Sequence, residues 1–237
     1  MSTPQAAAPD AALVDAIAAR RDALRRRIAE RTDRDVRIVC VTKAHPPEVA
    51  AAALAAGFAD LGENYAQELR DKDAVLRDKD AVLRDDRALG DVVRWHFIGQ
   101  LQTNKVRLIA DVVDLWQTVD RTSLADQVAR RAPGARVLVQ LDLAGIAGRG
   151  GCDPSEAPAL VAHCRGQGLQ VEGLMGVGMP GEPEDARAGF RLLSQVADEL
   201  GLRERSMGMS ADLDVAVDEG ATIVRVGSAL VGPRPPR

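Results

Sequence analysis

A lysine at the end of an expected strand is the residue of this sequence best placed to do chemistry. Lys43 follows the apolar run of residues 37–42, and Pro46 and Pro47 close the strand behind it. At the mouth of a barrel, such a lysine is partly desolvated, and desolvation lowers the pKa of an ammonium until the free amine can attack an aldehyde. Only four of the 31 basic residues are lysines, so Lys43 and Lys105 stand out. A rim lysine in an ion pair is the alternative interpretation of Lys43.

Two segments near the C-terminus predict an anion site. Ser210 ends SMGMS and precedes Ala-Asp-Leu-Asp, the position of a helix N-cap, and Ser228 follows Arg225 and Gly227 at another helix start. Hydroxyls and free backbone N–H groups after strands seven and eight bind phosphate in many barrels. Taken alone, each serine is more often a plain helix cap, and the two together with Gly227 carry the interpretation as an anion site.

Other motifs carry weaker signals. The sequence GVGMPG at residues 176–181 matches a dinucleotide fingerprint, but Pro180 removes one N–H donor and no acidic residue follows at the required distance. Among the three histidines, His96 alternates with apolar neighbours and is expected to be a hydrogen-bonded core residue. No HExxH, CxxC or Ser/His/Asp arrangement supports a zinc or hydrolase site.

The elements that must position these residues alternate regularly along the chain. An amphipathic helix is expected over residues 10–31. Strands are expected at 37–42, 58–62, 92–98, 113–118, 136–143, 169–175, 204–207 and 222–226, with helices at 46–57, 64–89, 104–110, 122–131, 154–167, 182–200 and 211–219 and a short turn at Ser228. Eight strand–helix units predict a single α/β domain, a (β/α)₈ TIM barrel with a leading N-terminal helix. We expect residues 1–9 to be a disordered N-terminus, 10–232 to form the barrel and 233–237 to be a C-terminal tail.

Composition excludes several functional classes. The 31 basic and 35 acidic residues are intermixed and give a net charge of −4, which argues against a nucleic-acid partner. The longest apolar run is too short to cross a bilayer, and three cysteines without metal-ligand spacing favour a cytoplasmic protein.

The heptad DKDAVLR at 71–77 recurs at 78–84. We interpret this duplication as a solvated helix extension, with a coiled-coil contact to a partner as the alternative.

An ordered series of motifs marks a resemblance to a known family. The segments are VTKAHPP, GENYAQEL, WHFIGQLQTNK, GLMGVGMP, SMGMSADLDVAVDEGAT and VRVGSALVG. Together they resemble the pyridoxal phosphate homeostasis protein family, which is similar in fold to the N-terminal barrel of alanine racemase. The resemblance covers residues 10 to 232.

The resemblance implies a role for each matching residue. Lys43 would hold pyridoxal 5′-phosphate (PLP) as a Schiff base. The other implied cofactor contacts are Ser210, Gly227 and Ser228 to the phosphate, Arg225 to the pyridine nitrogen, Asn64 and His96 along the ring, and Met207, Gly208 and Met209 as a wall beside the phosphate. A permanent cation at the ring nitrogen weakens the ring as an electron sink. Asp142 and Arg149 depart from the asparagine and lysine frequent in the family.

The resemblance also implies a carrier. The family takes part in intracellular PLP homeostasis, storing or supplying the cofactor without an established reaction, so we expect no enzyme. Related racemases and decarboxylases use a second domain, for which this sequence leaves no expected segment. The alternative is a PLP-dependent amino-acid racemase or other slow enzyme acting through Lys43, and a third possibility is a partner-recruiting protein in which the cofactor stabilises the fold. Expected partners are PLP and PLP-dependent apo-enzymes, without nucleic acid or membrane, and a monomer is expected.

Overall fold

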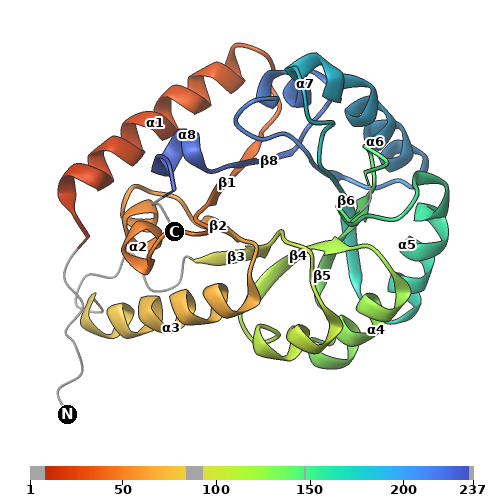
Figure 1. The fold of residues 1–237 in the computed structure, drawn as a ribbon, viewed down its shortest axis with the longest axis horizontal. Helices are drawn as coiled ribbons and strands as arrows, with labels where there is room; N and C mark the ends of the chain where they lie inside the picture. The colour runs from red at the N-terminus through yellow and green to blue at the C-terminus, as the bar shows by residue number, and fades with distance from the viewer. Residues whose placement is uncertain (1–8, 84–92, 147, 235–237) are drawn as a thin grey trace.

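Parallel strands close into a barrel in sequence order, with β1 beside β8 (Figure 1). The computed structural model describes residues 9–83, 93–146 and 148–234. Within these ranges the strands are β1 (Arg37–Val41), β2 (Asp60–Glu63), β3 (Arg94–Phe97), β4 (Val113–Val119), β5 (Arg136–Leu141), β6 (Gln170–Gly176), β7 (Glu204–Ser206) and β8 (Ile223–Val226). The expected (β/α)₈ barrel is confirmed.

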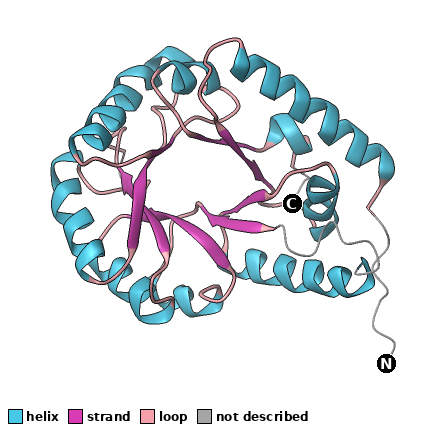
Figure 2. Ribbon diagram, turned by 180° about the vertical axis from the view of Figure 1, so that it is seen from behind, coloured by secondary structure: helices cyan, strands magenta, loops and turns pink. Residues whose placement is uncertain are grey.

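Helices surround the strands as an outer ring (Figure 2). They are α1 (Ala11–Ala29), α2 (Pro47–Ala55), α3 (Ala66–Leu83), α4 (Thr122–Arg131), α5 (Ala157–Gly166), α6 (Arg187–Glu199), α7 (Leu213–Asp218) and α8 (Ser228–Val231), with 3₁₀-helices η1 (Thr103–Leu108), η2 (Pro154–Glu156) and η3 (Pro183–Ala186). The leading helix α1 is confirmed, and its buried residues Ile17, Leu24 and Ile28 form the apolar face that the sequence pattern indicated. The expected disordered segment 1–9 lies outside the described residues except for its last position.

Four helix predictions need correction. The segment expected as a helix at 104–110 is the 3₁₀-helix η1, and the helices expected at 154–167 and 182–200 each begin with a 3₁₀ turn that has a proline at its first position. Helix α7 begins only at Leu213, with Asp212 at the cap position. Ser210 is therefore not the cap of α7, and its hydroxyl makes no hydrogen bond to another described residue.

The barrel interior and the layer outside it are separate apolar clusters. Val39, Leu115, Leu138, Met175 and Ile223 pack together inside the barrel, whereas the larger cluster joins the strands to the helices. Along each strand alternate side chains therefore point inward, as period-2 geometry requires. The same alternation directs the residues that follow the strands into the mouth of the barrel.

The first copy of the duplicated heptad packs against the barrel. Lys72, Asp73 and Leu76 in α3 are buried, and Asp73 accepts a hydrogen bond from Trp95 Nε1 at 3.0 Å. The side chains of the second copy lie outside the described residues. Among the helices that the structure describes, none is long and apolar enough to span a membrane.

Candidate cofactor site

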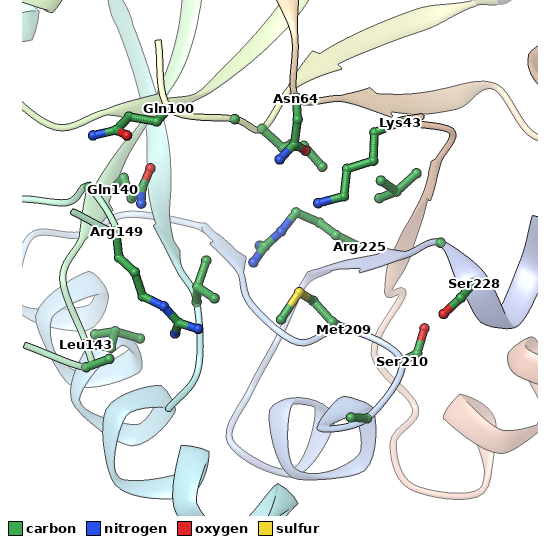
Figure 3. A pocket seen from close by; sticks show the side chains of 18 of the residues that line it. Lys43, Asn64, Gln100, Gln140, Leu143, Arg149, Met209, Ser210, Arg225 and Ser228 are labelled. Carbon is green, nitrogen blue, oxygen red and sulfur yellow. The ribbon is translucent and has the colours of Figure 1, made fainter. Parts of the chain in front are cut away.

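A cavity of about 620 Å³ opens at the C-terminal ends of the strands. Figure 3 shows Lys43 on one side, with Arg225 beside it and the two serines beyond. Its walls include seven of the residues that the resemblance places in the site: Lys43, Asn64, Met209, Ser210, Arg225, Gly227 and Ser228. Residues from β1, β2 and β8 and from the loop after β7 thus meet in one place, because parallel strands of a closed barrel end at the same rim.

The amine of Lys43 lies in a partly desolvated, positively charged setting. Burial lowers the pKa of Lys43, and the nearby Arg234 and Arg225 lower it further, while Glu63 and Glu68 oppose the shift. The free amine is therefore populated at lower pH than in an ordinary lysine. This is the state that attacks an aldehyde.

Two hydroxyls form one side of the cavity. Figure 3 shows the side-chain oxygens of Ser210 and Ser228 pointing toward one another. Within the described residues the backbone N–H groups of Ser210, Ala211 and Ser228 donate no hydrogen bond. A Cβ at Gly227 would lie 3.2 Å from the carbonyl oxygen of Val41, so glycine lets β8 approach β1 closely. The result is a cluster of hydrogen-bond donors of the size that a phosphate group needs.

Arg225 is buried beneath the centre of the cavity. It is 4% exposed, its two terminal nitrogens donate to Ser206 Oγ at 2.7 Å and to the carbonyl oxygen of Gly176 at 2.8 Å, and burial lowers its pKa to about 10. The side chain therefore stays cationic at neutral pH. Asn64 Oδ1 is buried without a hydrogen-bond partner among the described residues, so it is available to a ligand donor.

A buried ionic cluster fixes the backbone around Lys43. Lys72 Nζ donates to the carbonyl oxygen of Thr42 at 2.7 Å and to Glu63 and Glu68 at 2.6 Å each. Glu68 also accepts from the backbone N–H of Ala44, which has a φ of 60°. The residues before and after Lys43 are thus both held by side chains of β2 and α3.

Comparison with known proteins agrees with this geometry. The family model for the N-terminal domain of alanine racemase matches residues 14–235. The pyridoxal phosphate homeostasis protein of Pseudomonas aeruginosa is 36% identical over 88% of this chain and 90% of its own length, and the human protein of that name is 34% identical over 84% and 76%. The chain belongs to the pyridoxal phosphate homeostasis protein family. A solved family structure, PipY of Synechococcus elongatus with PLP bound, has a TM-score of 0.71 and 31% identity over 91% of this chain and all of its own.

Two residues that the family resemblance placed against the cofactor do not line the cavity. His96 points into the barrel one layer below the mouth, and both of its ring nitrogens are hydrogen-bonded, to Asp60 and to Gln117. The core role that alternation indicated is the one the structure shows. Met207 faces outward into the apolar layer under the helices, whereas Met209 lines the cavity. Neither residue is therefore part of the described cavity wall, and their contact with the cofactor stays a prediction.

The structure adds cavity residues that local sequence reasoning missed. Gln100, Gln140, Arg149 and Arg234 line the wall or the rim. Gln140 lies at an inward-facing position of β5, and Gln100 continues the inward-facing alternation beyond the end of β3. The period-2 pattern of the sequence could therefore have identified both residues. Arg149 lies in the glycine-rich loop after β5. With Lys43 and Arg225, the two arginines give the described wall four cations against one carboxylate, Asp142, so this family member presents a strongly anion-attracting pocket.

Proposed function

We propose that this member of the pyridoxal phosphate homeostasis protein family binds PLP in the cavity through Lys43 and acts by holding and supplying the cofactor. The observation that carries the proposal is the placement of a partly desolvated lysine amine and a cluster of hydroxyl and N–H donors in one cavity (Figure 3). The solved structure of PipY is described with PLP bound, which supports the same ligand here.

The residues present fit such a ligand. When bound, PLP supplies an aldehyde that condenses with an unprotonated primary amine and releases one water. Lys43 is the amine, and burial keeps it unprotonated at a lower pH than usual. Ser210, Ser228 and the backbone beside Gly227, which line the cavity, would hold the phosphate, and Arg225 would donate to the ring nitrogen. Asn64 contributes its unpartnered oxygen beside the ring.

A carrier is favoured over a catalyst by the chemistry of the wall. Arg225 is cationic and buried, and a cation beside the ring nitrogen disfavours protonation there, which weakens the ring as an electron sink. Tyr65, the one tyrosine of the sequence, is 53% exposed and does not line the cavity.

We further propose that the clients are PLP-dependent apo-enzymes in the cytoplasm. The three unpaired cysteines support this compartment.

Borohydride trapping tests the proposal. We expect the purified protein to develop an absorption band with PLP, and reduction followed by peptide mapping to place one adduct on Lys43. Lys43→Ala removes both signals, because no other described lysine lines the cavity. Lys105→Ala, which changes an exposed lysine of η1, leaves them intact.

Two results would contradict it. An adduct on Lys105 or Lys72 in the native protein places the ligand elsewhere. Turnover of common amino acids by the PLP-loaded protein, lost in Lys43→Ala, replaces the carrier with the alternative racemase or related enzyme.

A further inference from the structure

A continuous hydrogen-bonded chain runs from Arg225 through the barrel interior to its opposite end. Arg225 donates to Ser206 Oγ at 2.7 Å, and Ser206 Oγ donates to Gln117 Oε1 at 2.6 Å. Gln117 Nε2 lies 2.7 Å from His96 Nδ1, and His96 Nε2 lies 2.9 Å from Asp60 Oδ1. These five residues come from β8, β7, β4, β3 and β2.

Donor and acceptor chemistry assigns a direction to every bond in this chain when the Gln117 amide is oriented as in the structure. A guanidinium only donates, so Ser206 Oγ accepts a hydrogen bond from Arg225 and donates its own hydroxyl hydrogen bond to Gln117 Oε1. The Gln117 amide nitrogen then donates to His96 Nδ1, which leaves the proton of His96 on Nε2, facing Asp60. The reverse orientation of the Gln117 amide would leave the Ser206 hydroxyl proton without an acceptor. Bonds that all point one way strengthen one another.

The chain is rigid because it is buried and anchored. His96, Gln117 and Ser206 are at most 2% exposed, so any of them that rotated away would lose a hydrogen bond that water cannot replace. At the far end Asp60 is also bound by Arg94, at 2.9 and 2.7 Å. These bonds to His96 and Arg94 hold the pKa of Asp60 well below its ordinary value, although burial opposes the shift.

The other end of the chain meets the cavity. The second terminal nitrogen of Arg225 is held by the carbonyl oxygen of Gly176 at 2.8 Å. Within the described residues no carboxylate contacts the guanidinium; Asp212 acts on it only at longer range. Ser206 is therefore the side chain that sets the orientation of the guanidinium, and Nε has no protein partner in the described part of the chain.

We propose that Ser206, Gln117 and His96 are positioning residues that hold Arg225 in a single orientation as donor to the ring nitrogen of the cofactor, with Asp60 as their anchor. The inference rests on the proposed function, and it assigns His96 a role without cofactor contact. A donor fixed before binding loses little conformational entropy when the ligand arrives. The chain thus contributes to affinity specifically through the ring nitrogen.

A ligand that lacks this nitrogen separates positioning from general stability. The experiment measures dissociation constants of PLP and of its 1-deaza analogue, in which C–H replaces the ring nitrogen. We expect the native protein to prefer PLP and Ser206→Ala to weaken PLP about tenfold, the scale of one charge-assisted hydrogen bond, while the analogue changes less than about twofold. Gln117→Met, which removes the next acceptor with little change in volume, shifts the two ligands in the same unequal way.

Two control variants complete the experiment. Thr118→Val changes a buried neighbour of Gln117 whose side-chain hydroxyl makes no hydrogen bond among the described residues, and we expect it to leave both affinities unchanged. Ser206→Thr keeps the hydroxyl and restores the preference for PLP.

Four outcomes decide the matter. The unequal loss supports the proposal. An equal loss for both ligands, or no loss for either, overturns it, because the chain then acts on the fold alone or not at all. A native protein that binds both ligands equally well overturns the contact to the ring nitrogen but leaves the proposed function intact. A native protein that binds neither ligand contradicts the proposed function itself.

Discussion

At the scale of single residues, Lys43 and Lys72 show how surroundings give the same side chain opposite roles. Lys72 is 1% exposed and holds three acceptors, including two glutamates, so its charge is compensated. Lys43 is only partly buried, and its nearest charges include Arg225 and Arg234. Burial and the charges of these two arginines lower the pKa of Lys43 more than Glu63 and Glu68 raise it, and we therefore expect Lys43 to be the reactive amine of the pair.

Removing the cation at the rim raises the pKa of Lys43. We expect Arg234→Gln to shift the pH of half-maximal labelling of Lys43 upward in the ligand-free protein, because the ammonium then meets less repulsion. The measurement is the labelling rate with an amine reagent against pH, read by peptide mass. The shift shrinks at high salt, since Arg234 is exposed and its field is screened.

The matched control for this experiment is Arg149→Gln. Arg149 also lines the cavity but is not among the principal charges that act on Lys43. An equal shift in both variants would show that the total charge of the wall, rather than the position of Arg234, sets the pKa.

At the scale of elements, α3 and β2 form a support for the end of β1. Glu63 from β2 and Glu68 and Lys72 from α3 bind the backbone or the side chain of Thr42 and Ala44. One oxygen of Glu63 is buried without a hydrogen-bond partner among the described residues, so the cluster keeps one unsatisfied acceptor. Because Lys72 belongs to the first copy of the heptad, that copy is fixed in place by the cluster.

Replacing Lys72 therefore destabilises the fold. We expect Lys72→Met to lower the free energy of unfolding by about 3–5 kcal/mol, because a buried carboxylate loses its counter-charge. Urea denaturation measures the loss, and Lys105→Met, at an exposed position, stays within about 0.5 kcal/mol of the native protein. A deficit below about 1 kcal/mol would mean that Glu63 is already protonated in the native fold.

The same variant has a defined pH dependence. Burial raises the pKa of Glu63, and the charge of Lys72 opposes that shift. Without Lys72 the pKa of Glu63 rises further, so the folded state binds a proton more tightly than the unfolded chain does. Stability then falls as pH increases through this range, and the deficit of Lys72→Met relative to the native protein shrinks toward acid pH.

Element patterns predicted the direction of side chains better than their height in the barrel. Period-2 alternation and closure place Lys43 and Arg225 inside the barrel, and the structure confirms both at the cavity. Alternation is the same in every layer of the barrel, so it does not distinguish the layer that lines the cavity from the layer below it, where His96 lies. Met207 lies in the apolar layer outside the strands. Arg234 joins the cavity across a sequence separation of 191 residues from Lys43, which no local pattern records.

At the scale of the whole molecule, the cavity lies where the first and the last strand of the barrel meet. Lys43 follows the first strand, whereas Arg225 and Ser228 belong to the last strand and the turn after it. Helix α1 spans the same junction, with Arg27 2.8 Å from Asp214 and Arg31 2.7 Å from Asp218 in α7. A ligand that binds Lys43 and Ser228 together therefore bridges the strands β1 and β8 that close the barrel.

Such a ligand stabilises the folded chain against heat. At about 100 times its dissociation constant, PLP adds about 2.7 kcal/mol to the free energy of unfolding, which corresponds to a rise in Tm of about 5–10 °C for a chain of this size. Lys43→Ala loses most of the rise, and inorganic phosphate gives a smaller one. Thermal denaturation followed by circular dichroism measures these shifts. Lysines of the unfolded chain react with the aldehyde too, so a Tm that stays constant while the absorption band saturates would show that PLP binds folded and unfolded chains alike, without a built site.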